Sequence, residues 1–121
     1  MILHKMPVVF VVSRDWTLRA AVRAELREAG VDALGLETAD DVGETLARGI
    51  SPALIVVDAA ELETPAAREA LGNLARTVAV LVIESRMMPA PDLPGAERLQ
   101  RPLSVGDIVA RVLARLAERA G

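Results

Sequence analysis

One short run of residues most limits what this chain can fold into. Residues 54–57 are all apolar, three of them are β-branched, and the run follows Ser51-Pro52 and ends at Asp58. Such a run without alternation is typical of a strand that is buried on both faces, as in a parallel sheet covered by helices. Ligands and chemistry collect at the carboxyl ends of such strands, where the strand order reverses. The sequence therefore predicts that Asp58 lies at the functional edge of a doubly wound fold.

The rest of the chain repeats this pattern. Apolar runs predict further strands at 8–12, 31–36 and 78–83, and residues 97–100 can form a short last strand. The strand at 31–36 is expected at a sheet edge because Asp32 and Gly35 interrupt it. Apolar residues at helical spacing predict helices near 15–29, 38–49, 64–76 and 104–120. Alternating elements of this length form parallel βαβ units with right-handed crossovers. We predict one α/β domain over residues 1–121, a flavodoxin-like doubly wound five-stranded parallel sheet in the order 2-1-3-4-5.

The segment before the last predicted strand departs from this alternation. Residues 87–95 contain three prolines, which remove backbone donors and clash with the preceding helical turn. The fourth helix is therefore predicted to be reduced or absent. A lost helix leaves apolar sheet surface that this loop, a partner or a second copy must cover, so a homodimer through the loop and the last helix is expected.

Composition excludes several classes of protein. The 121 residues include no cysteine and one histidine, His4, and acidic and basic residues are mixed to a net charge of −3. These features argue against thiolate or histidine metal sites and against a nucleic-acid surface. The first apolar run is too short for a signal sequence or a membrane span. We predict a cytoplasmic protein that binds neither membrane nor nucleic acid and needs no cofactor or metal.

Three features together resemble a known family. They are the apolar strand that ends at Val12, Asp58 at the end of the third strand, and Arg101-Pro102 before the last helix. In this order they resemble the receiver domain of bacterial response regulators. The resemblance implies that Asp58 is the phosphoacceptor, and that two carboxylates after the first strand bind Mg²⁺. It also implies a Ser or Thr after the fourth strand and a Lys-Pro after the fifth.

The expected acidic pair is replaced. Its two positions fall on Ser13 and Arg14, and Asp15 is a carboxylate one residue late. Mg²⁺ prefers hard oxygen ligands, usually including carboxylates, and a guanidinium at Arg14 repels the ion. We expect Arg14 to pair with Asp58 instead, because guanidinium and carboxylate match in geometry.

The other two expected positions also differ from the family pattern. The hydroxyl after the fourth strand falls on Ile83 or Glu84, with Ser85 slightly late, and Arg101 stands in place of the lysine. Arginine keeps the positive charge but not the compact ammonium group. We expect Arg101 to be a second partner of Asp58.

These substitutions favour a non-catalytic, receiver-like signalling module that binds signalling proteins and is not switched by phosphorylation. Trp16, Met87 and Met88 are its predicted partner contacts, since tryptophan and methionine suit such surfaces. One alternative is a phosphorylatable receiver that uses Asp58 with Mg²⁺. Another is a small flavodoxin-like ligand-binding domain or enzyme, although no Gly-rich phosphate loop follows the first strand.

Overall fold

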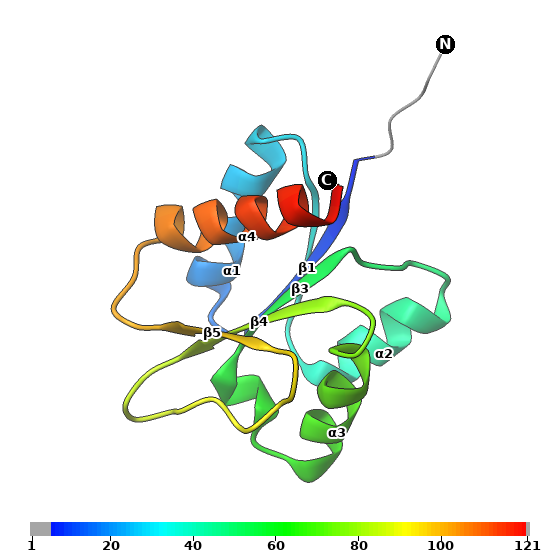
Figure 1. Ribbon diagram of the computed structural model, residues 1–121, viewed down its shortest axis with the longest axis vertical. Helices are drawn as coiled ribbons and strands as arrows, with labels where there is room; N and C mark the ends of the chain where they lie inside the picture. Colours follow the sequence, from blue (N-terminus) through cyan, green and yellow to red (C-terminus); the bar gives the residue numbers. More distant parts are fainter. Residues whose placement is uncertain (1–5, 121) are drawn as a thin grey trace.

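The structure is a computed structural model that describes residues 6–120, and His4 lies outside this range. Over this range the chain forms one five-stranded parallel sheet in the order β2-β1-β3-β4-β5 (Figure 1). The predicted fold and strand order are therefore confirmed. The elements in chain order are β1 (Val8–Val12), α1 (Trp16–Glu28), β2 (Asp32–Leu36), α2 (Ala39–Ala47), β3 (Leu54–Asp58), the 3₁₀ helix η1 (Ala59–Leu62), α3 (Pro65–Leu74), β4 (Ala79–Glu84), β5 (Glu97–Gln100) and α4 (Val105–Ala120).

Two helical layers enclose the sheet. Helices α1 and α4 contact each other on one face, and α2 and α3 contact each other on the other (Figure 1). Apolar side chains alternate along β1 and β3 between the two resulting cores, with Val9 and Val56 in one and Phe10 and Ile55 in the other. This double burial explains why the inner strands have unbroken apolar sequences. The interrupted strand β2 lies at one edge, as predicted, and β5 lies at the other.

The helices begin where short polar side chains accept hydrogen bonds from free backbone N–H groups. Thr38 and Asp41 form a reciprocal capping box at α2, and Ser104 and Asp107 make the same pair of bonds at α4. Helix α3 has Thr64 as its N-cap and ends at Leu74, two residues before the predicted end at Arg76. It ends early because the backbone N–H groups of residues 77 and 78 both donate to the Leu74 carbonyl in a turn.

The segment between β4 and β5 contains no helix, as the prolines predicted. Its side chains instead cover the sheet face that α2 and α3 share. Leu93 is buried there, and Met88, Ala90 and Ala96 pack against the same core. The loop therefore covers much of the apolar surface that a fourth helix would cover in a regular doubly wound fold.

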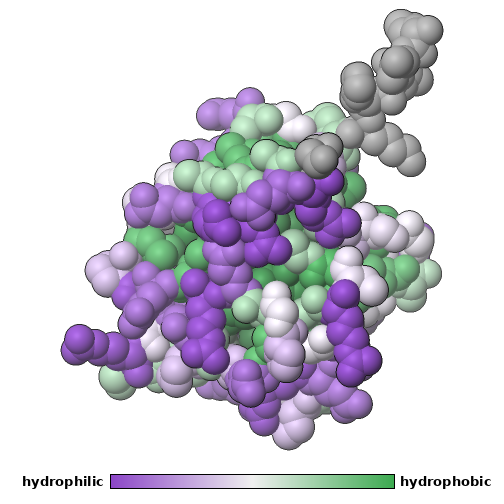
Figure 2. Space-filling model, viewed as in Figure 1, coloured by the Kyte–Doolittle hydropathy of each residue, from purple (hydrophilic) through white to green (hydrophobic). Residues whose placement is uncertain are grey.

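A charged cluster attaches the edge strand β5 to α4. The Glu97 carboxylate accepts hydrogen bonds from both Arg111 and Arg115, with Arg115 Nη1 at 2.8 Å from Glu97 Oε1. Hydrogen bonds from Arg111 and then Arg115 lower the pKa of Glu97, although partial burial opposes them. Hydrophilic side chains accordingly gather along α4 (Figure 2). No helix in the described part of the chain is long and apolar enough to cross a membrane.

The packing of the proline loop can be tested with two of its own apolar residues. Leu93 is 8 % exposed and Met87 is 91 % exposed. We expect Leu93→Ala to lower the free energy of unfolding by about 2–3 kcal/mol, since it removes buried methyl groups and leaves a cavity. Met87→Ala should change it by less than about 0.5 kcal/mol. Urea denaturation checks both values, and equal effects of the two variants would show that the loop does not pack as described.

The Glu97 cluster predicts a pH dependence. The folded-state pKa of Glu97 is lowered. The contribution of the Glu97 carboxylate to stability is therefore complete above the unfolded-state pKa of about 4.3, and it is lost as the pH falls through the lower folded-state pKa. Glu97→Gln should cost about 1–2 kcal/mol at pH 7, and this difference from the parent protein should shrink on acidification. Urea denaturation at pH 7 and pH 4 measures it. The exposed Glu69→Gln is the control, and a Glu97 effect that grows in acid would contradict the assignment.

Candidate functional site

The loops after β1, β3 and β5 meet at the carboxyl edge of the sheet. Asp58 is the last residue of β3, Ser13 follows β1 directly, and Arg101 follows β5. Strands β1 and β3 are paired neighbours in the sheet, and the strand order reverses beside them. The structure therefore brings Asp58, Ser13 and Arg101 together at the edge that the sequence indicated.

The Asp58 carboxylate accepts hydrogen bonds from three neighbouring groups. Its Oδ2 accepts from Arg101 Nη2 at 3.2 Å and from Ser13 Oγ at 3.4 Å. Its Oδ1 accepts from the backbone N–H of Ala60 at 3.2 Å, so Asp58 is also the N-cap of η1. The side chain is 15 % exposed. Asp58 thus bonds with a cation, a hydroxyl and the backbone of a helix terminus.

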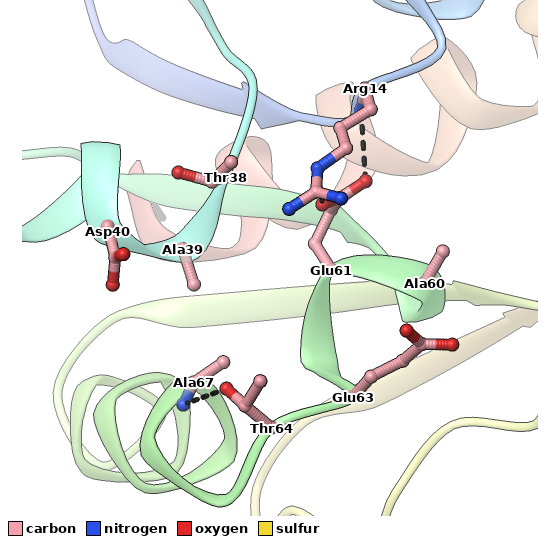
Figure 3. Close-up of a pocket in the computed structure, with 9 residues that line it drawn as sticks. All are labelled: Arg14, Thr38, Ala39, Asp40, Ala60, Glu61, Glu63, Thr64 and Ala67. Carbon is pink, nitrogen blue, oxygen red and sulfur yellow. Dashed lines mark hydrogen bonds and ion pairs between the residues drawn. The ribbon is translucent and has the colours of Figure 1, made fainter.

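Arg14 does not pair with Asp58, so that expectation was wrong. Its Nε lies 3.2 Å from Glu61 Oε1, and its backbone N–H donates to Glu61 Oε2 at 3.0 Å (Figure 3). The Glu61 side chain is only 4 % exposed, whereas that of Arg14 is 73 % exposed. The reason is η1, which turns the chain directly after Asp58 and brings Glu61 against the loop after β1.

Sequence reasoning missed Glu61 and the turn that carries it. A usable signal was present, because Asp58-Ala59-Ala60-Glu61 has the spacing of an N-cap followed by an acid in the first turn. Glu61 lies beside a shallow cleft of about 130 Å³ between the loop after β1, the start of α2 and the start of α3. The residues that line this cleft are Arg14, Thr38, Ala39, Asp40, Ala60, Glu61, Glu63, Thr64 and Ala67 (Figure 3).

Asp15 is used as a helix cap. Its Oδ1 accepts from the backbone N–H of Leu18 at 3.2 Å, which starts α1, and its own N–H donates to Ser13 Oγ at 3.1 Å. The Asp15 carboxylate, one residue after the expected acidic pair, is therefore engaged in capping α1. Within residues 6–120, no group of three or more His, Cys, Asp or Glu side chains is arranged to hold a metal ion.

The three candidates for the missing hydroxyl have separate local roles. Ile83 is in the core, opposite Asp58 in the β3–β4 register. Glu84 accepts from the backbone N–H of Ala90 at 2.7 Å, which ties the proline loop to the end of β4. Ser85 forms a turn with Met88, whose N–H donates to Ser85 Oγ at 3.1 Å. In the described range, no side-chain hydrogen bond joins these three residues to Asp58.

The predicted partner contacts differ in exposure. Trp16 is 68 % exposed and Met87 is 91 % exposed, although both are large apolar side chains. Met88 is half-buried and packs against the core shared by α2 and α3. It is therefore a packing residue of the loop, and the prediction of a free contact fits Met87 better than Met88.

Comparison with known proteins identifies the fold. No family model and no curated protein matches the sequence. Among solved structures, a response-regulator receiver domain protein from Clostridium thermocellum superposes with a TM-score of 0.72 at 14% identity, over 95% of this chain and 98% of the other. A response regulator receiver protein from Burkholderia phymatum gives 0.68 at 22% identity, over 92% and 95%. The chain therefore has the fold of response-regulator receiver domains.

The same fold also occurs within a larger enzyme. The lysine decarboxylase LdcF of Francisella novicida matches 96% of this chain with a TM-score of 0.72 and 16% identity, but the match covers only 18% of that enzyme. A function must therefore be argued from the residues of the site, since one fold can serve several roles.

The contacts of Asp58 predict the sign of a coupling energy. Asp58→Asn keeps a good N-cap for η1 but removes the charge that Arg101 meets. Since the Arg101 side chain is 40 % exposed, a double-mutant cycle with Arg101→Gln should give a favourable coupling of only about 0.5–1 kcal/mol. Urea denaturation supplies the free energies, and Arg86→Gln in the neighbouring loop is the control. A stabilising Asp58→Asn, as expected in a site crowded with carboxylates, would contradict the pairing.

Proposed function

We propose that the chain is a non-catalytic signalling module with the receiver fold, which binds protein partners and is not switched by phosphorylation. The proposal rests on the hydrogen bonds that the Asp58 carboxylate makes within the protein. Its carboxylate already bonds to Arg101, Ser13 and the backbone of Ala60. A phosphoacceptor must present an oxygen to the incoming phosphorus atom, and these bonds compete for both carboxylate oxygens of Asp58.

The donor set around Asp58 also supports the proposal. Phosphoryl transfer relies on a metal ion to neutralise charge on the transferred group, and Mg²⁺ demands an octahedral set of oxygen ligands. Beside Asp58 stand a hydroxyl at Ser13 and the guanidinium group of Arg101, and the carboxylate of Glu61 is already paired with Arg14. These residues do not fit a Mg²⁺ site, because the Arg101 guanidinium repels the ion and the Glu61 carboxylate is engaged with Arg14.

The surface supports binding of another protein rather than of a second copy. The homodimer was expected from apolar surface left by the missing helix, yet Leu93 and Met88 cover the core there. Trp16 remains 68 % exposed, and tryptophan is enriched among residues that dominate binding energy. We therefore assign the module a different signalling protein as its partner. Its cytoplasmic location stays a prediction from the sequence.

Phosphorylation can be tested directly. Incubation with acetyl phosphate and millimolar Mg²⁺ should leave the protein unlabelled, as judged by intact mass and by phosphate-affinity gel electrophoresis. Mg²⁺ alone should not change the fluorescence of Trp16, which lies two residues after Arg14. Arg14→Asp is the matched comparison, since it restores a carboxylate beside the site and should strengthen any Mg²⁺ response. An acid-labile phosphate that is lost in Asp58→Asn would overturn the proposal and restore the phosphorylatable alternative.

A further inference from the structure

One face of α1 carries an exposed tryptophan and three arginines in a single row. Trp16, Arg19, Arg23 and Arg27 follow one another at intervals of three, four and four residues. This spacing places them on the same side of a helix. We call these four residues the α1 row. Ala20 and Ala24, which are exposed and small, are close to it in the sequence.

Within residues 6–120, no ion pair balances the positive charge of the α1 row. Among residues 6–120, no carboxylate lies within 4.0 Å of the guanidinium groups of the row, whereas Arg111 and Arg115 on α4 both pair with Glu97. Arg19 Nη1 donates to the neutral carbonyl of Ser13 at 2.6 Å. Burial, with repulsion from Arg27 and Arg19, lowers the pKa of Arg23. The row therefore concentrates like charges, which costs stability.

The side chains of Arg19 and Arg23 are held in place before any partner binds. Gly35 on the edge strand β2 makes room for both, since a Cβ there would lie 2.8 Å from Arg23 Cδ and 3.0 Å from Arg19 Cδ. Arg23 Nε also donates to the carbonyl of Ala33 at 3.2 Å. Groups that are already ordered lose less entropy on binding, so this arrangement favours recognition.

The geometry selects the form of the partner. Four residues of an α-helix advance about 6 Å along its axis, so a second helix with an acid at every fourth position matches the arginines. A partner strand on β2 is disfavoured, because Arg23 occupies the outward carbonyl of Ala33. A long polyanion such as DNA is disfavoured as well, since Glu25 and Glu28 are exposed on the same helix and the net charge is −3.

From these contacts we infer that the α1 row is a docking surface for an acidic helix of a partner protein, with the arginines meeting its carboxylates and Trp16 packing on its apolar residues. The inference shares with the proposed function only the assumption that the partner is a protein. Docking on the α1 row requires no change at Asp58, so the docking surface and the proposed function can fail separately.

A designed peptide tests the inference. The probe is a capped helical peptide with Glu at every fourth position of one face, and the same peptide with Gln in those positions is the control. Binding is followed by the fluorescence of Trp16, the sole tryptophan, and by anisotropy of a labelled peptide. The Glu peptide should bind at least tenfold more tightly than the Gln peptide, and its affinity should fall as salt is added.

Variants place the binding site. Arg23→Gln with Arg27→Gln should weaken binding of the Glu peptide at least tenfold. The control pair Arg48→Gln with Arg98→Gln replaces exposed arginines outside α1 and should change binding less than twofold. Circular dichroism and urea denaturation show that the variants are folded.

Equal effects of the two pairs of variants on peptide binding, or equal affinities for the Glu and Gln peptides, would overturn the inference. Tighter and row-dependent binding of a short DNA duplex would replace it with a nucleic-acid site. Acetyl phosphate labelling of the same samples reports on the proposed function separately.

Discussion

The burial of the inner strands on both faces is the constraint on which the rest of the structure depends. Side chains such as Phe10, Ile55 and Val80 are completely removed from solvent between the sheet and its helical layers. Each such side chain contributes roughly 1.5–3 kcal/mol, and a one-residue shift of a strand would exchange the side chains of the two cores. The register is therefore fixed, and with it the positions of the loops that follow the strands. Ser13 and Asp58 meet because their strands cannot slide.

At that edge a single carboxylate serves several local purposes. Asp58 caps η1, accepts a bond from Ser13 and pairs with Arg101. These contacts differ in kind, since the cap stabilises the turn, while the exposed ion pair contributes little energy but orients the carboxylate. The position that a parallel sheet offers for chemistry is here occupied by bonds within the protein. The same turn supplies Glu61, which gives Arg14 a buried partner and leaves Arg101 as the cation at Asp58.

Much of the fold could be predicted from the sequence because it follows from local rules. Apolar runs, capping residues such as Thr38 and Ser104, and the prolines of residues 87–95 each act over a few positions. The partner of Arg14 could not be predicted in this way. Two carboxylates, Asp58 and Glu61, lie at the end of β3 and in the turn that follows it, and the pairing of Arg14 with Glu61 depends on that short turn. Likewise, the burial of Met88 and the exposure of Met87 depend on how the loop packs, which composition does not encode.

The two proposals are connected through one residue. Ser13 donates its hydroxyl to Asp58, and its backbone carbonyl accepts from Arg19 on the α1 row. In a switchable protein, such a link would transmit a change at the carboxylate to the docking surface. Here the carboxylate is already held by Arg101 and by the turn, so Ser13 is held as well and Arg19 keeps a fixed partner. Under the proposed function Asp58 does not change, so the α1 row would be presented continuously, and control of the interaction would then lie with the partner or its concentration.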